Sequence, residues 1–184
     1  MNSDPIDLTF GGRLRLPLIV APMFLVSSPA LAIAACGRGA IGSFPSHSTR
    51  TREDFQKWLE ITEQGLDELR DKGLKPAPFA VNLVVNKTNP RFEGDLELCI
   101  QKRVEIVLTS KGAPTDVFDR IHSYGGIAFH DVATRRHAEK ALAAGADGIV
   151  AVCNGAGGHT GQQNPFGLVN EIRQITDKPI VLAG

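Results

Sequence analysis

The sequence lacks the features that mark secreted, membrane-spanning and nucleic-acid-binding proteins. Its three cysteines, Cys36, Cys99 and Cys153, are odd in number and widely spaced, so we expect them to be reduced rather than paired or metal-bound. Twenty basic and twenty acidic residues cancel, and no basic run is present, which argues against a nucleic-acid partner. No apolar run approaches the roughly 18 residues that a membrane span needs.

A secretory leader is also not visible at the start of the chain. Residues 1–10 include two acids and a proline where a leader would carry a basic segment and then an apolar one. We therefore expect a cytoplasmic protein with no membrane partner. At 184 residues, 42% of them hydrophobic, the chain is long enough to bury a core in one domain.

What the chain does have is a glycine-rich loop that follows an apolar run at residues 148–152. Such a run is typical of a strand covered on both faces. After the loop, Asn164 and Pro165 form a good helix start. Because ligands bind at the carboxyl ends of parallel strands, we interpret the loop as part of a binding site rather than a simple turn. It holds one imidazole among four glycines: His159 with Gly155, Gly157, Gly158 and Gly161.

The rest of the chain alternates expected strands and helices, which implies a parallel sheet with right-handed crossovers. Seven strands are expected, at residues 16–21, 40–44, 79–85, 104–109, 126–130, 148–152 and 179–183. Six helices are expected, at residues 29–36, from Thr51 through Leu69 with a break allowed at Gly65, and at 96–102, 114–122, 133–144 and 165–176. The unit spacing, and the lack of G-x-G-x-x-G after the first strand, favour a (β/α)8 TIM barrel over a doubly wound sheet.

A complete barrel of this kind has eight strands and about 250 residues. Here the seventh expected strand reaches residue 183 of 184. We therefore expect one domain over residues 1–184 that corresponds to a TIM barrel truncated after strand 7, without its last strand and helices. An open strand edge invites pairing with another chain, and a homo-oligomer is one way of covering it.

The expected strand ends carry few acids, and Asp131 is the only carboxylate among them. This argues against hydrolysis by paired carboxylates and against a hard-metal site. His130 and His159 lack a third ligand for zinc, so we predict no metal site. We interpret Cys153 as a small core residue rather than a nucleophile. Backbone donors, an amide, hydroxyls and imidazoles suit a large planar cofactor that brings its own chemistry.

Five motifs follow one another along the chain: PLIVAPM at 17–23, GSF at 42–44, AVNL at 80–83, GADG at 145–148 and AGGHTG at 156–161. In this order they resemble the nitronate monooxygenase family, formerly called 2-nitropropane dioxygenases. The resemblance implies an FMN-dependent barrel that uses O2 to oxidise alkyl nitronates, giving a carbonyl compound and nitrite.

The same resemblance assigns roles to individual residues. His159 matches the family's catalytic histidine, whose neutral imidazole takes a proton from the carbon next to a nitro group. The sequence departs from the family at Val152 and Gly155, where Gln and Glu are common. The implied cofactor-binding residues are Ala21, Pro22 and Met23 along the flavin ring, Asn82 through a hydrogen bond, Gly157 and Gly158 through their backbone, Gly184 at the start of the phosphate-binding turn, and His130 where many members have lysine.

Two alternatives remain open beside this reading. One is an FMN-dependent NAD(P)H:quinone or enoyl-thioester reductase of the same fold, which the motifs do not separate from a nitronate monooxygenase. The other is an inactive fragment that acts only by association through an open barrel edge.

Overall fold

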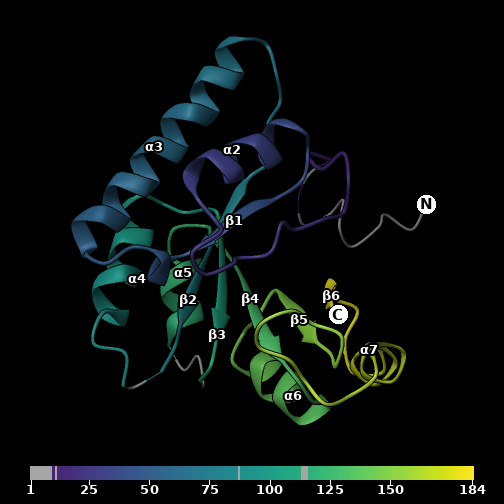
Figure 1. Cartoon of the computed structure of the whole chain (residues 1–184). Coiled ribbons are helices and arrows are strands. Elements are labelled where there is room, and N and C mark those ends of the chain that lie inside the picture. The colour runs from purple at the N-terminus through teal and green to yellow at the C-terminus, as the bar shows by residue number, and fades with distance from the viewer. Residues whose placement is uncertain (1–9, 11, 87, 113–115) are drawn as a thin grey trace.

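Six parallel strands form one curled sheet with helices packed along its outer face (Figure 1). A computed structural model describes residues 10, 12–86, 88–112 and 116–184. The strands pair in chain order: β1 (Gly42–Pro45), β2 (Phe79–Val84), β3 (Ile106–Ser110), β4 (Ile127–Val132), β5 (Gly148–Val152) and β6 (Ile180–Ala183). A helix separates each strand from the next. The predicted (β/α) barrel architecture is confirmed.

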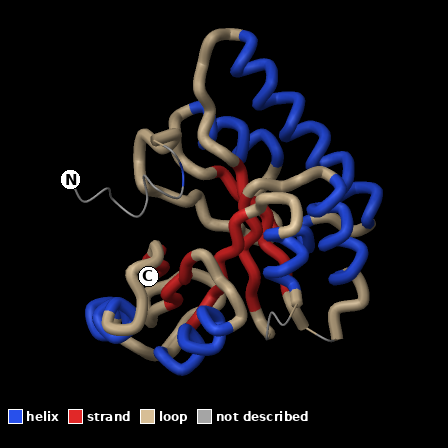
Figure 2. The backbone as a smooth tube through the Cα atoms, turned by 180° about the vertical axis from the view of Figure 1, so that it is seen from behind, coloured by secondary structure: helices blue, strands red, loops and turns tan. Residues whose placement is uncertain are grey.

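The helices lie on the outside of the curled sheet, as the tube in Figure 2 shows. Side chains cap several of them: Ser28, Thr51, Thr134 and Asn164 each accept a hydrogen bond from a backbone N–H of the first turn, the arrangement favoured at helix starts. The bounds are α2 (Pro29–Gly37), the 3-10 turn η1 (Ser46–Ser48), α3 (Arg52–Asp71), α4 (Phe92–Gln101), α5 (Val117–His122), α6 (Arg135–Ala143) and α7 (Pro165–Arg173). The start of the predicted helix at 114–122 lies partly outside the described residues.

The long helix α3 runs without a break through Gly65, where the sequence allowed one. A Cβ at Gly65 would lie 2.4 Å from the Cδ1 atom of Ile33. The glycine therefore lets α2 pack closely against α3, and this contact offsets the intrinsic helix cost of about 1 kcal/mol relative to alanine.

The predicted strand at residues 16–21 is reduced in the structure to an isolated parallel bridge between Ile19 and Ile41. In the described part of the chain, this segment pairs on one side: the Val20 N–H donates to Ile41 O at 2.8 Å, and the Ile41 N–H donates to Leu18 O at 2.9 Å. Pro17 has no N–H to extend the ladder, and the side chains of Leu16 and Leu18 are exposed. The prediction of seven regular strands was therefore wrong for the segment at 16–21, and the described residues form six.

The sheet has two buried faces, because the side chains of each strand alternate between them. The helix-facing side carries one cluster, with Phe44, Val81, Leu83 and Val107 packed against the helices. The interior side carries a second cluster: Phe10, Ile41, Ala80, Ile106, Leu108, Phe129 and Val150. Strands of this kind are buried on both sides, which explains their continuous apolar runs.

Phe10 belongs to the interior cluster. Its ring stacks on Phe129, with centroids 6.3 Å apart and planes at 12°. Arg13 holds this segment in place, donating from Nε to Phe10 O at 3.0 Å and from its terminal nitrogens to Glu105, just before β3. Gly148 pairs in register with Phe129, and a Cβ at Gly148 would lie 2.1 Å from Cε1 of that ring. The interior packing therefore needs a residue without a side chain at position 148.

Among the described residues, no helix combines the length and the apolar character that crossing a bilayer requires. Cys36, Cys99 and Cys153 are buried, unpaired thiols. Burial raises the pKa of Cys36 to about 11, which keeps that thiol protonated and unreactive at neutral pH.

We expect Gly148→Ala to lower the free energy of unfolding by about 2 kcal/mol, because the new methyl group overlaps the Phe129 ring and forces the interior to shift. Gly157→Ala is the matched control, since a Cβ there meets nothing within 4 Å. Urea denaturation of both variants checks this. Equal stability of the two would contradict the tight Phe129–Gly148 contact.

Candidate functional site

Polar side chains replace the apolar ones near the carboxyl ends of the strands on the interior face. Asn82 pairs in register with Leu108, and Val84 with Ser110, so Asn82 and Ser110 share the face of the interior cluster. Asn82 is 7% exposed, and its Nδ2 donates to Leu108 O at 3.3 Å and to Ser110 Oγ at 3.4 Å. Within the described part of the chain, no donor reaches its Oδ1. The carboxamide is thus held rigidly with one acceptor available to a ligand.

Neighbouring residues on β4 point in opposite directions. Ile127 and Phe129 belong to the interior cluster, whereas Ala128 and Val132 belong to the helix-facing one. By this alternation Asp131 faces the barrel interior and His130 faces the helices. Asp131 is half-buried, and burial raises its pKa to about 7.

His130 is packed between the sheet and α5. Its Nδ1 lies 2.7 Å from Thr109 Oγ1, and its ring meets Phe118 edge-on with centroids 6.2 Å apart. Burial, and secondarily the charge of His137, lower the pKa of His130 to about 4, against a backbone hydrogen bond at Gly112 that raises it. The imidazole is therefore a neutral, structural group at neutral pH. By the alternation along β4 it lies on the opposite face of the sheet from Asn82, and its predicted contact with a cofactor stays a prediction.

The glycine-rich loop after β5 is folded around one carbonyl group. Cys153 O accepts hydrogen bonds from Ala156 N at 3.2 Å, from Gly161 N at 3.1 Å and from Thr160 Oγ1 at 2.9 Å. A Cβ at Gly161 would lie 2.2 Å from Val152 O, so this closure requires glycine. The Cys153 thiol is buried, and burial raises its pKa, which fits the core role predicted for it.

The outer part of this loop presents His159 to solvent beside open backbone. Gly158 has a φ of +78°, which glycine adopts without strain, and a Cβ at Gly157 or Gly158 would meet nothing within 4 Å. Gly184, with a φ of +100°, lies against the base of the loop: a Cβ there would be 2.0 Å from Ala156 N. The loop and Gly184 thus form one surface with accessible peptide groups, at the same end of the barrel as Asn82.

The Ala21–Pro22–Met23 turn lies beside β1, at the edge of the sheet opposite to β6. The Ser27 side chain shapes the turn, since its Oγ accepts from Met23 N at 2.9 Å and donates to Ala21 O at 3.4 Å. Ser43 on β1 donates to Val20 O and joins the turn to the sheet. Ala21 and Met23 are exposed, so their faces are available to a ligand.

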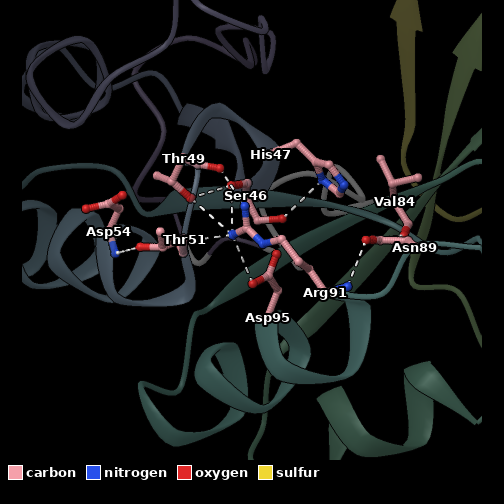
Figure 3. A network of polar contacts seen from close by, with 9 residues as sticks. All are labelled: Ser46, His47, Thr49, Thr51, Asp54, Val84, Asn89, Arg91 and Asp95. Carbon is pink, nitrogen blue, oxygen red and sulfur yellow. Dashed lines mark hydrogen bonds and ion pairs between the residues drawn. The ribbon is translucent and has the colours of Figure 1, made fainter.

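The sequence analysis did not predict the polar cluster around Arg91 at this end of the barrel. Figure 3 shows the Arg91 guanidinium between the loop after β1 and the first turn of α4. Arg91 donates to the backbone carbonyls of Ser46, Thr49 and Thr51, to Thr49 Oγ1 at 3.2 Å and to Asp95 Oδ1 at 3.2 Å. The four-residue spacing of Arg91 and Asp95 was the available signal. This cluster fixes the loop that carries His47.

No group of three or more potential ligands among the described residues is arranged to hold a metal ion.

Comparison with known proteins identifies relatives over nearly the whole chain. The family model described as nitronate monooxygenase matches residues 12–184. A curated nitronate monooxygenase from Neurospora crassa is 28% identical over 198 residues, covering 88% of this chain and 49% of the relative. A curated (3aS,4S,5R,7aS)-5-hydroxy-7a-methyl-1-oxo-octahydro-1H-indene-4-carboxyl-CoA dehydrogenase from Rhodococcus jostii is 23% identical over 168 residues, covering 91% of this chain and 44% of the relative.

The fold has a solved counterpart in FabK from Thermotoga maritima, with a TM-score of 0.84 at 24% identity, covering 99% of this chain and 54% of that one. The chain thus spans about half the length of the curated relatives it matches.

We expect Arg91→Ala to lower the free energy of unfolding by about 3 kcal/mol, because it leaves the buried Asp95 carboxylate without its cation and frees the loop after β1. Arg50→Ala, at an exposed position on the same loop, should change stability by less than about 0.5 kcal/mol. Chemical denaturation measures both. A small effect of Arg91→Ala would mean that the cluster in Figure 3 contributes little.

Proposed function

Because the chain belongs to the nitronate monooxygenase family, we propose that it forms the flavin-binding and catalytic part of an FMN-dependent oxidoreductase. Its substrates would be alkyl nitronates or nitroalkanes, oxidised with O2 to a carbonyl compound and nitrite. The observation that carries the proposal is a set of interior polar side chains at the carboxyl ends of the strands, next to a glycine loop that presents one exposed imidazole.

The residues at this end of the barrel suit a flavin. Asn82 offers a fixed amide with a free acceptor, and the open peptide groups at Gly157 and Gly158 allow a flat ring system to approach closely. The positive φ of Gly184 suits the start of a phosphate-binding turn, since glycine backbones there offer N–H groups to anions. Ala21, Pro22 and Met23 would border the ring. Bound FMN would supply the two-electron oxidation and the reaction with O2.

His159 is proposed as the catalytic base. Its imidazole is exposed on a loop whose shape is fixed by the Cys153 carbonyl, so it is accessible to a substrate at the end of the barrel where the flavin is proposed to bind. A neutral imidazole accepts a proton from the carbon bearing the nitro group, and in its charged form stabilises the nitronate. A well-placed base contributes about 10²–10⁴-fold in rate.

A reductase or dehydrogenase of the same fold is the second candidate. It is favoured by the match to a dehydrogenase whose name gives a CoA ester as substrate. The two functions differ in the partner of the flavin. Bleaching of bound flavin by NADPH, without nitrite release from nitronates, would support the reductase. Nitrite release with no response to NADPH would support the proposed oxidation.

Visible absorption of the purified chain, before and after addition of FMN, tests the proposal directly. Flavin peaks that remain with the protein through gel filtration are the expected result. A chain that stays colourless would overturn the proposal that these 184 residues bind the cofactor by themselves.

We expect Asn82→Ala to raise the dissociation constant for FMN by about tenfold, the effect of losing one hydrogen bond. Gln56→Ala, an exposed change on α3, should leave it unchanged. Quenching of flavin fluorescence during titration gives both constants. An unchanged affinity in the Asn82 variant would remove this residue from the proposed cofactor-binding set.

We expect His159→Ala to retain flavin but to slow the oxidation of neutral nitroalkanes about 10²–10⁴-fold, with little effect on preformed nitronates, which need no deprotonation. His137→Ala, on the exposed face of α6, is the control and should leave both rates unchanged. Oxygen uptake with each substrate form is the measurement. Equal losses on both forms would count against a base.

A further inference from the structure

The strand β4 contributes a carboxyl group to the barrel interior at the end where the flavin is proposed to bind. Asp131 follows Phe129 on the interior face and pairs in register with Val150, which belongs to the same interior cluster. On the next strand, Ser110 stands at the corresponding carboxyl end and contacts Asn82. Asn82, Ser110 and Asp131 therefore lie on the same interior face of β2, β3 and β4. In register Asn82 is level with Leu108 and Phe129, so Ser110 and Asp131 lie two residues nearer the carboxyl ends of their strands.

Among the described residues, the half-buried side chain of Asp131 makes no hydrogen bond. Burial alone raises the pKa of Asp131, and among the described residues no neighbouring cation compensates the charge of its ionised form. An unpaired carboxylate in such a place costs free energy, and the group reduces this cost by holding its proton to higher pH.

The surroundings of β4 agree with this. The loops after β3 and β5 carry Lys111 and His159, both with exposed side chains. The interior side chains of β5 beside Asp131 are Val150 and Val152, which are not titratable. The titratable side chains of α5 and α6, among them His122 and His137, lie on the helix side of the sheet.

We propose that Asp131, rather than His130, is the contribution of β4 to the flavin-binding site, and that its protonated carboxyl group donates a hydrogen bond to an acceptor atom of the flavin ring. This rests on the proposed function. The ring system of a flavin carries several carbonyl and imine acceptors and few donors, so a neutral acid matches it better than an anion. Ionisation of Asp131 replaces this donor with a charge that the interior does not stabilise.

Binding of the flavin is then coupled to the charge of Asp131. With a pKa of about 7, the carboxyl is mostly protonated at pH 6 and mostly ionised at pH 8. If only the protonated form binds, affinity falls about tenfold across this range. Asp131→Asn keeps a donor but has no proton to lose, so its affinity should stay within about threefold of the pH 6 value of the natural protein at both pH values.

Riboflavin is the probe, because it lacks the phosphate that titrates in the same range. Dissociation constants at pH 6 and pH 8 are measured for the natural chain, Asp131→Asn and the exposed control Asp177→Asn, by fluorescence quenching. The natural chain and the control should lose about tenfold in affinity between the two pH values, while Asp131→Asn should not. Dividing the dissociation constant of the natural chain by that of Asp131→Asn at each pH removes the pH effects that the two proteins share.

A second measurement needs no flavin. The folded-state pKa of Asp131 lies above its unfolded value, so the folded state holds the extra proton between the two, and stability is lost as pH rises through that range. Asp131→Asn has no such loss. The melting temperature of the variant minus that of the natural chain should therefore increase from pH 4.5 to pH 7. A difference that stays constant overturns the proposal that Asp131 is held protonated.

The outcomes separate the two proposals. Riboflavin binding with the same pH dependence in the natural chain and in Asp131→Asn overturns the role of Asp131 and leaves the proposed function standing. Absence of riboflavin and FMN binding by every protein at both pH values overturns the proposed function and the flavin-facing role together. A tenfold loss confined to proteins that retain Asp131 supports both.

Discussion

The register of the parallel ladder is the constraint on which the rest of this structure depends. Each pairing, from Ser43 with Ala80 to Val152 with Ala183, places two side chains on the same face of the sheet. A shift by one residue would exchange the interior and helix-facing clusters completely. The register therefore determines which groups meet the helices and which meet a ligand. Phe129 against Gly148 is a position where a shifted register has no room.

Much of the fold could be read from the sequence because its signals are local. Strands buried on both faces appear as continuous apolar runs, and caps such as Thr51 and Asn164 act within one helical turn. The segment at 16–21 has the same apolar pattern, yet it forms a single bridge. Its pairing depends on which strands lie next to it in the folded chain, and the local sequence pattern does not contain that information. The helix packing that keeps α3 straight at Gly65 is non-local in the same way.

The candidate site shows a similar limit. The glycine loop with His159 and the strand-end Asn82 were proposed from residue type and position, and their roles stay predictions. The sequence could not show that Asp131, and not His130, faces the interior, because a strand covered on both sides lacks the polar alternation that would show which neighbour points inward. Arg91 was missed because its partners, Thr49 and Thr51, are about forty positions away in sequence and meet it only in the folded chain.

The loop after β5 is held by its own main chain. Three donors converge on the carbonyl oxygen of Cys153, two of them peptide N–H groups, and none of them changes charge near neutral pH. These three hydrogen bonds therefore do not depend on the protonation of a side chain near neutral pH. The side chain at position 159 takes no part in these hydrogen bonds. A substitution of His159 would therefore leave the backbone conformation of the loop unchanged.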